Sequence, residues 1–284
     1  MLPALTIRRA SVAMLTAAVM LSGASLAAAH TNSPARPQPT PAAKRVGISP
    51  GNAYLGWRNR PVHSMTSSGL TTTTTTTATS GVQGLDVASY QGNVDWNYWN
   101  AKGKRFAYVK ATEGTSYRNP YFGSQYRGSY DAGLIRGAYH FAAPGNASGA
   151  AQADYFVRYG GSWSRDGRTL PGVLDVEYNP YGATCYGLTQ AQMVSWIKSF
   201  TTRYKYRTSR DAVLYTTLDW WTKCTGNSTA FNQTNPLWIA RYASTPGTLP
   251  GNWPFYTFWQ YTSSPLDQDR FSANYTRLVA LANG

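Results

Sequence analysis

The chain has 284 residues, of which 42% are hydrophobic, and it contains 10 Trp, 21 Tyr and 9 Phe. This composition excludes a wholly disordered protein and is sufficient for a sizeable core, in one large domain or two small ones. The formal charge is +14, from 26 Lys+Arg and only 12 Asp+Glu. All 12 acids lie after residue 80, so the last 204 residues carry a net charge of +7.

The first 29 residues have the order of a secretory signal peptide: two arginines at 8 and 9, an apolar stretch over 10–26 and three alanines at 27–29. We expect cleavage after Ala29 and a secreted, extracellular protein. A retained membrane anchor is disfavoured because Ser, Thr and Gly interrupt the apolar stretch and a small-residue site follows it. No later stretch is apolar enough to span a bilayer, so we expect no membrane contact after processing.

Residues 30–80 are rich in Thr, Pro, Ser and Ala, include a run of threonines at 71–77 and contain no acid. Such a segment offers little apolar surface to offset the entropy lost on ordering. We therefore predict a disordered propeptide or linker. A basic tail can cling to an anionic surface, but a solvated tether is the favoured interpretation.

The remaining chain, residues 81–284, alternates strand and helix patterns. Short apolar runs predict strands at 82–87, 106–111, 134–141, 172–176, 212–216, 237–242 and 255–261. Helices are predicted at 94–103, 120–132, 147–159 and 189–206. The last has the strongest pattern, because apolar residues recur at helical spacing and Thr189 with Gln192 forms a capping box.

This alternation predicts a parallel sheet with both faces covered. Five units are β/α, whereas the last strands leave little room for helices between them, so we predict an irregular TIM-like (β/α)5β3 barrel as a single catalytic domain over 81–284. A doubly wound sheet is the competing fold. It would require a Gly-rich turn after the first strand, which residues 88–92 do not supply.

Cys185 and Cys224 are the only cysteines, 39 positions apart, and in a secreted protein they predict one disulfide. Two thiols and a lone His140 do not make a four-ligand metal site, so no metal is expected, and no cofactor is suggested. The basic charge comes with no nucleic-acid-binding motif. We expect instead an anionic cell-wall surface as the partner, and a monomer.

Half of the carboxylates lie where predicted strands end. Asp86 ends the first strand, Glu113 follows the second, and Asp175 and Glu177 end the fourth, while Asp267 and Asp269 follow the last. In a parallel barrel the C-terminal ends of different strands meet at one opening, where active sites lie. We therefore expect these acids to converge.

The sequence Asp175-Val176-Glu177 places two carboxyl groups on one face of a strand. When two carboxyl groups lie this near each other, their repulsion raises the pKa of one of them. One group can then remain a protonated general acid while the other stays ionised, as the cleavage of a glycosidic bond requires. The alternative is a strand end whose acids cap loops or pair with Arg241. The additional acids at Asp86 and Asp267 favour a site.

Aromatic residues accompany these acids and suit the stacking of sugar rings. Tyr139, Tyr215 and Trp259 end strands and are the predicted substrate-binding aromatics, together with Tyr178, which follows Glu177. Any one of them can equally be ordinary core. His140, next to Tyr139, must point the opposite way in a regular strand and is interpreted as structural.

Several motifs in this order resemble the glycoside hydrolase family 25 lysozymes, also called the Chalaropsis type. The similarity covers about residues 83–281 and is strongest to secreted actinobacterial members. It rests on Gly84 to Gln91, Phe106 to Gly114, Gly137 to Phe141, Leu174 to Glu177, Trp238 to Tyr242, Trp259 to Tyr261 and the pair Leu266-Asp267. The segments around Cys185 and Cys224 resemble a disulfide pattern of the same group.

The resemblance implies a lysozyme that hydrolyses the β-1,4 bond between N-acetylmuramic acid and N-acetylglucosamine in peptidoglycan. It assigns Glu177 as proton donor and Asp175 as the residue that assists the substrate acetamido group, with Asp86 and Asp267 completing the catalytic acids. Glu113 and Asp269 are expected among the substrate-binding residues. Here the last motif contains a second acid, Asp269, so the choice between Asp267 and Asp269 stays open.

Two other functions fit parts of this pattern. A barrel-type chitinase also uses an Asp-x-Glu strand end, but its further Asp residues upstream are absent from residues 170–174. A noncatalytic cell-wall glycan-binding module would use the aromatics and leave the acids structural. Hydrolysis of bacterial walls but not chitin separates the lysozyme from both.

Overall fold

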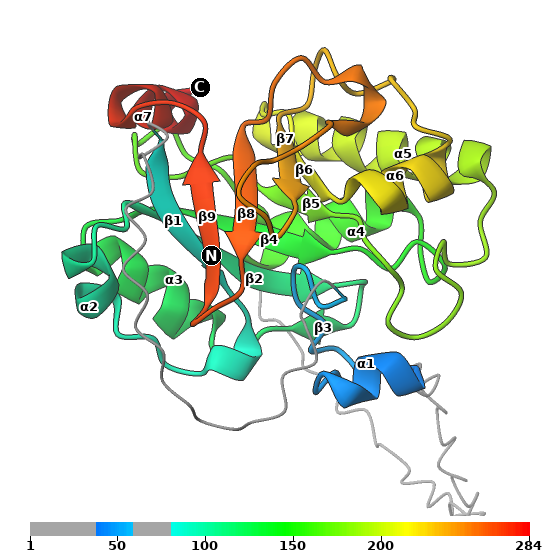
Figure 1. Ribbon diagram of the computed structural model, residues 1–284, viewed down its shortest axis with the longest axis horizontal. Coiled ribbons are helices and arrows are strands. Elements are labelled where there is room, and N and C mark those ends of the chain that lie inside the picture. Colours follow the sequence, from blue (N-terminus) through cyan, green and yellow to red (C-terminus); the bar gives the residue numbers. More distant parts are fainter. Residues whose placement is uncertain (1–37, 59–80) are drawn as a thin grey trace, which may run out of the picture. The chain divides into compact units, whose positions relative to one another are not determined.

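The computed structural model describes residues 38–58 and 81–284 (Figure 1). The predicted signal peptide at 1–29 and the stretches 30–37 and 59–80 lie outside the described residues. None of the helices in the described ranges is both long and apolar enough to cross a membrane.

Eight strands form a closed barrel. Seven of them run parallel: β1 (Val82–Val87), β2 (Phe106–Glu113), β4 (Ile135–Phe141), β5 (Val173–Asp175), β6 (Val213–Thr216), β7 (Leu237–Ala240) and β8 (Phe258–Thr262). The eighth, β9 (Asp267–Phe271), is antiparallel to both β8 and β1, and pairing of β1 with β2 closes the ring. A short strand of two residues, β3 (Tyr117–Arg118), pairs antiparallel with the end of β2. The predicted (β/α)5β3 barrel is confirmed.

Helices cover the outside of the barrel, and Figure 1 shows α4, α5 and α6 grouped on one flank and α2 and α3 on another. The bounds are α2 (Trp96–Ala101), α3 (Phe122–Asp131), α4 (Gly149–Phe156), α5 (Gln190–Thr208), α6 (Leu218–Thr225) and α7 (Tyr275–Asn283), with short 3-10 or π turns at Ser89–Gln91, Val157–Gly161 and Pro250–Asn252. In α5 the predicted capping box between Thr189 and Gln192 is present. Its side chains Met193, Ile197 and Phe200 are fully buried, as their spacing predicts.

The sequence pattern did not indicate α6, α7 or β9. Helix α6 is only eight residues long and contains Trp, Thr and Cys, which have low helix propensity. It forms because Thr217 caps it, with Oγ1 accepting from Trp220 N at 3.1 Å, and because Trp220 and Trp221 are fully buried. Tertiary packing therefore decides this helix.

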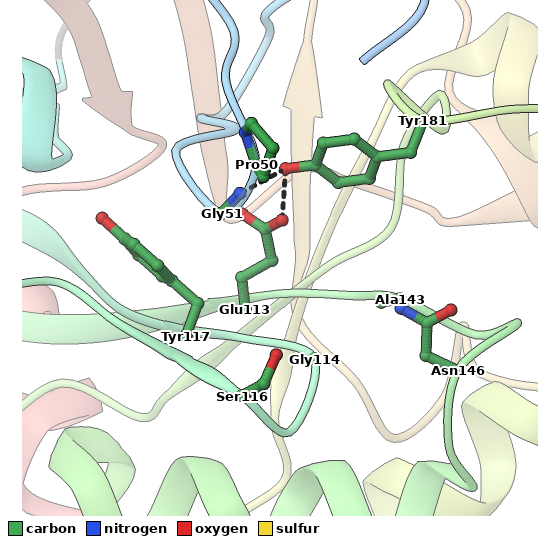
Figure 2. A pocket seen from close by; sticks show the side chains of 9 residues that line it. All are labelled: Pro50, Gly51, Glu113, Gly114, Ser116, Tyr117, Ala143, Asn146 and Tyr181. Atoms are coloured by element: carbon green, nitrogen blue, oxygen red, sulfur yellow. Dashed lines mark hydrogen bonds between the residues drawn. The ribbon is translucent and has the colours of Figure 1, made fainter. Parts of the chain in front are cut away.

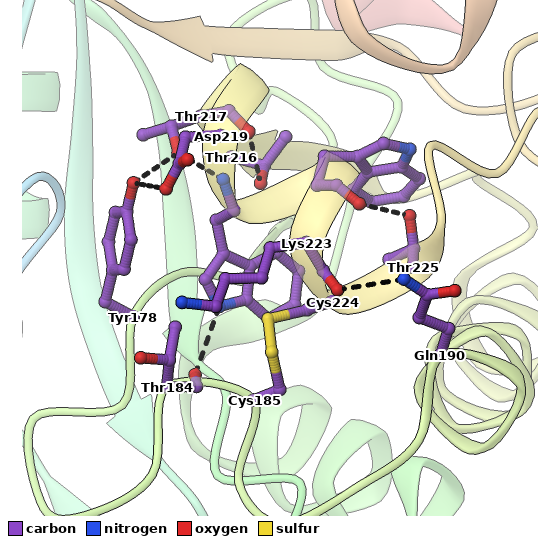
Figure 3. The surroundings of a disulfide bond; sticks show 12 residues. Tyr178, Thr184, Cys185, Gln190, Thr216, Thr217, Asp219, Lys223, Cys224 and Thr225 are labelled. Atoms are coloured by element: carbon purple, nitrogen blue, oxygen red, sulfur yellow. Dashed lines mark hydrogen bonds between the residues drawn. A yellow bond between two sulfur atoms is a disulfide. The ribbon is translucent and has the colours of Figure 1, made fainter.

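The disulfide predicted between Cys185 and Cys224 is present, with Cα atoms 5.3 Å apart. It joins the loop after β5 to helix α6 (Figure 3). Beside it, Tyr178 Oη donates to Asp219 Oδ2 at 2.7 Å, so the same loop is also held to α6 by a hydrogen bond. Both contacts fix the chain that directly follows β5.

Alternation along the strands separates two layers of core. Tyr108, Tyr139, Tyr215, Trp238 and Phe258 face the barrel interior and pack together, whereas their strand neighbours face the helices. Gly137 makes room for one of these rings, because a Cβ there would lie 2.6 Å from Cδ1 of Tyr108. These rings fill much of the barrel interior.

Residues 38–58, called the N-terminal segment below, differ from the disordered propeptide or linker that the composition predicts. They contain helix α1 (Pro41–Arg45), capped by Thr40. Tyr54, Leu55 and Trp57 are at most 4% exposed. The average composition of residues 30–80 conceals this local apolar cluster, and the surface on which it is buried is supplied by residues more than 100 positions away.

Candidate active site

Four predicted acids meet at the mouth of the barrel, the end at which the parallel strands have their C-termini. Asp86 lies near the end of β1, Asp175 ends β5 and Glu177 follows it by two residues. Asp267 is directly opposite Asp86 in the ladder of β1 and β9. All four side chains are at most 1% exposed. The convergence expected from the strand ends is therefore present.

The antiparallel direction of β9 corrects the expectation that Asp267 and Asp269 merely follow the last strand. Since β9 starts at Asp267, its first residue, and not its last, lies at the mouth. Asp269 points to the same side but is opposite Gly84, two residues deeper in the barrel. The two acids thus occupy different levels, with Asp267 at the mouth and Asp269 beneath it.

Gln260 on β8 connects the two sides of this site. Its Nε2 donates to Asp86 Oδ2 at 2.7 Å, and its Oε1 accepts from Tyr215 Oη at 2.7 Å and from Tyr242 Oη at 3.1 Å. The amide therefore fixes one oxygen of Asp86 and orients two tyrosine hydroxyls. Tyr90 Oη in turn donates to Asp267 Oδ2 at 3.2 Å.

Strand β2 contributes a buried ion pair to the mouth. Lys110 Nζ is 2.6 Å from Glu113 Oε2, although residues three apart on a regular strand face opposite sides. The ladder between β2 and β4 shifts register between Lys110 and Thr112, and this bulge turns Glu113 toward Lys110. Tyr181 Oη donates to the other oxygen of Glu113.

Burial dominates the acid–base properties of the mouth. It raises the pKa of Glu177 well above its ordinary value, and the negative charge of Asp175 raises it further. Burial also raises the pKa of Asp175 well above normal, while the Lys110 ammonium acts in the opposite direction. Lys110 is the main influence that opposes the rise in the pKa of Asp175 and only a minor one on Glu177, so it favours the ionised form of Asp175 more than that of Glu177.

The two acids differ in their hydrogen bonds. Glu177 Oε1 accepts from the backbone N–H of Gly56 at 2.7 Å, whereas its Oε2 has no partner among the described residues. Within the same ranges, neither carboxylate oxygen of Asp175 has a hydrogen-bond partner. Buried carboxylate oxygens without partners are costly, and such an arrangement is typical of a group that acts on a ligand.

Asp86 at the mouth and Asp269 beneath it form a second acidic group. Burial raises the pKa of Asp86 well above normal, and the charges of Asp269 and Asp267 raise it further. The pKa of Asp269 is likewise raised by burial and by Asp267. At least one of these carboxyls therefore carries a proton under conditions in which an exposed aspartate is ionised.

The predicted aromatic residues take three different positions. Tyr139 and Tyr215 are fully buried in the barrel interior, level with Val173 and Asp175 of β5. Tyr178 lines an open groove of about 600 Å³ beside the mouth, with Asp219, Arg241 and Tyr242 among the other lining residues. Trp259 instead faces the helices, where its Nε1 donates to the Arg241 carbonyl at 2.9 Å. The structure therefore does not bring Trp259 together with the acids.

Sequence reasoning missed Lys110, Gln260, Tyr181 and Tyr242. Lys110 and Gln260 carried a usable signal, because each is a polar residue at an inward position of an otherwise apolar strand. Tyr181 and Tyr242 lie in loops with no such signal.

His140 is structural as predicted: its ring nitrogens lie 2.8 Å from Thr112 Oγ1 and 2.9 Å from Gln152 Oε1, on the helix side of β4. Over the described ranges no group of three or more His, Cys, Asp or Glu is placed to hold a metal ion.

Comparisons with known proteins identify close relatives. The family model for glycosyl hydrolases family 25 matches residues 85–269. Lysozyme M1 of Streptomyces globisporus is 46% identical over 257 residues, which cover 88% of this chain and 87% of that protein. The N,O-diacetylmuramidase of Chalaropsis sp is 56% identical over 183 residues, covering 63% of this chain and 87% of that protein.

Solved structures agree with these matches. The bacterial lysozyme from Streptomyces coelicolor has a TM-score of 0.71 and 50% identity over 72% of this chain and 99% of its own. The muramidase from Acremonium alcalophilum has a TM-score of 0.71 and 56% identity over the same shares. Residues 81–284 make up about that share of this chain, whereas the match to Lysozyme M1 is longer and includes residues before 81.

Proposed function

This chain belongs to glycosyl hydrolases family 25 and is a lysozyme that hydrolyses peptidoglycan; we propose that it is secreted and that Glu177 and Asp175 carry the reaction. The bond cut is the β-1,4 linkage between N-acetylmuramic acid and N-acetylglucosamine. One observation carries the assignment of residues: two buried carboxyls lie two positions apart at the end of β5, and the Lys110 ammonium opposes the rise in the pKa of Asp175 more than that of Glu177.

Glu177 is the general acid. Burial and the charge of Asp175 raise its pKa well above the ordinary value, which favours the protonated carboxyl that gives a proton to the glycosidic oxygen as the bond to C1 breaks. Its unpartnered Oε2 supports this role, because no described protein group competes for the proton at that oxygen.

Asp175 assists the substrate's own acetamido group. The acetamido oxygen attacks C1 as the leaving oxygen departs with the proton of Glu177. The ionised Asp175 accepts a hydrogen bond from the acetamido N–H and stabilises the positive charge that develops on the acetamido group. Water then attacks C1, the bond between C1 and the acetamido oxygen breaks, and the water loses a proton to Glu177, which restores the acid. The Lys110 ammonium supports the ionised form of Asp175.

The remaining acids hold the sugar. Asp267 is the better candidate than Asp269 for the second acid of the mouth, because it stands level with Asp86 while Asp269 lies deeper. Gln260 holds Asp86 in place through one of its carboxylate oxygens. Glycan continues along the groove beside Tyr178. The net charge of +7 after residue 80 favours adsorption to an anionic wall.

The test uses residues 81–284 and purified peptidoglycan, with the released fragments identified by mass spectrometry. We expect fragments with N-acetylmuramic acid at the reducing end and no release from chitin. Glu177→Gln should retain wall binding and lose hydrolysis by at least about a hundredfold. Asp131→Asn, at an exposed carboxylate on α3, is the matched control and should remain active.

A different result would separate the alternatives. Release from chitin but not from walls would identify a chitinase, and wall binding without hydrolysis by the unsubstituted barrel would identify a glycan-binding module. Full activity of Glu177→Gln would contradict the assignment of the acid.

A further inference from the structure

The N-terminal segment lies across the mouth of the barrel. Leu55 is fully buried and belongs to the same apolar cluster as Tyr139, Tyr215 and Trp238 of the barrel interior. Next to it, the Gly56 N–H donates to Glu177 at 2.7 Å. The segment therefore reaches the proposed general acid itself and does not merely rest on the rim.

Only a glycine fits at position 56. Its φ is +70°, and a Cβ there would lie 2.7 Å from Gln260 Oε1, 3.0 Å from Tyr215 Oη and closer still to Tyr242 Oη. The bare backbone thus fills the space between Glu177 and the Gln260 bridge. A sugar ring cannot occupy that space at the same time.

Both walls of the mouth hold the segment. On one side Lys110 Nζ donates to the carbonyls of Gly51, at 3.2 Å, and Ala53. Tyr181 Oη accepts from the N–H of Gly51 at 3.0 Å while it donates to Glu113. Figure 2 shows Pro50 and Gly51 directly beside Glu113 and Tyr181, around a residual cavity of about 30 Å³.

The other wall contributes Tyr178. Its carbonyl accepts from Trp57 Nε1 at 2.8 Å, and the Arg58 guanidinium lies 4.5 Å from its ring centroid. Tyr54 lies against Tyr90, with ring centroids 4.5 Å apart. The segment therefore covers both the buried acids and the near end of the open groove.

We propose that residues 38–58 are an inhibitory segment that occupies the glycan-binding mouth, so that the uncut chain is a latent form of the enzyme. This inference rests on the proposed function, since it assigns a regulator to the same site. The barrel does not need the segment to fold, because the solved relatives consist almost wholly of the matching barrel. Its contacts instead concentrate on the groups proposed to act on substrate.

The first experiment compares one protein before and after a single cut. A recognition sequence for a specific protease is inserted within the threonine run at 71–77 of the full chain, and the barrel is then cut and separated from the N-terminal piece. We expect hydrolysis to rise at least tenfold on cutting, with soluble glycan fragments as well as whole walls. A rise confined to whole walls would overturn the proposal, because it would indicate obstruction of wall contact and not of the mouth.

Two glycine variants of the uncut chain test the contact itself. Gly56→Ala introduces a methyl group into the filled space and should raise the activity of the uncut chain at least tenfold. Gly47→Ala is the matched control, because Gly47 also has a positive φ, of +81°, but a Cβ there meets nothing within 4 Å. If both variants activate equally, general loosening of the segment explains the effect and the specific contact is refuted.

A binding assay separates failure of this proposal from failure of the proposed function. A labelled peptide of residues 38–58 is titrated against the separated barrel carrying Glu177→Gln, whose amide oxygen can still accept from Gly56. We expect saturable binding, weakened at least tenfold by Gly56→Ala in the peptide. An active barrel with no peptide binding, or an uncut chain as active as the cut one, overturns the inhibitory segment. If the separated barrel without substitution is inactive although the peptide binds to the Glu177→Gln barrel, the proposed function is overturned and the docking of the segment stands.

Discussion

Substitution of Lys110 by methionine should destabilise the full chain, because it removes one partner of a fully buried ion pair. At the observed Nζ to Oε2 distance of 2.6 Å, an effective dielectric constant of 20 gives a gross attraction of about 6 kcal/mol. Desolvation of both ions offsets part of this, and removal of one member of a buried pair typically costs about 3–5 kcal/mol. Tyr181 still donates to Glu113 in the variant, so we expect about 3 kcal/mol.

The assay is urea unfolding of Lys110→Met, Glu113→Gln and the double variant, which together form a double-mutant cycle. The double variant should be more stable than the sum of the single effects predicts, with a coupling of about 2 kcal/mol, because neither buried charge is then left alone. Additive effects, or a loss below about 1 kcal/mol for Lys110→Met, would refute the reasoning. The same substitution removes a cation that opposes the rise in the pKa of Asp175, so that pKa should rise further.

Three further predictions address the site, the disulfide and the core. Because the pKa of Glu177 is raised above the ordinary value of 4.5, hydrolysis should decline as the pH rises through that raised pKa. Asp175→Asn removes the neighbouring negative charge, so the alkaline limb of its residual pH–activity profile should move to lower pH. An alkaline limb that does not move would exclude coupling of the two acids. Replacing Cys185 and Cys224 together by alanine should lower the free energy of unfolding by about 3 kcal/mol, measured in urea, and an unchanged midpoint would contradict the account of a closed 39-residue loop. Gly137→Ala should cost about 1–3 kcal/mol by thermal unfolding, because its methyl group overlaps a tyrosine ring inside the barrel, and no loss would show that the ring can move aside.

The alternation of strands and helices was readable from the sequence because it depends on local periodicity. Continuous apolar strands and the apolar stripe of α5 each reflect which faces are buried, and both were predicted near their observed bounds. The pairing of Asp175 with Glu177 was equally local, since two residues two positions apart at a strand end share a face. These features required no knowledge of which segments meet.

Which of Asp267 and Asp269 lies at the mouth could not be predicted from the neighbouring residues in the sequence. Strand β9 reverses direction and so brings Asp267, and not Asp269, beside Asp86. Nothing in the five residues of β9 specifies whether it runs parallel or antiparallel; its direction follows from the short connection after β8 and from the need to close the barrel. The choice that the sequence left open therefore depended on topology.

Register irregularities had the same effect at Lys110. Regular alternation assigns Lys110 and Glu113 to opposite faces of β2, and only the bulge between them forms the buried pair. A bulge depends on the pairing of two strands, and a single strand carries little trace of it. Sequence reasoning thus found Glu113 but missed its partner.

By itself the sequence determined the barrel, the disulfide and the acidic pair, because burial patterns, cysteine number and residue spacing act over a few positions. Tertiary structure alone decided the position of the N-terminal segment, whose apolar residues 53–57 are buried only because the barrel mouth presents Glu177, Lys110 and Tyr178 to them. A short cluster in a Thr- and Pro-rich stretch has no surface of its own on which to be buried. Its structure therefore exists only against residues that lie far away along the chain.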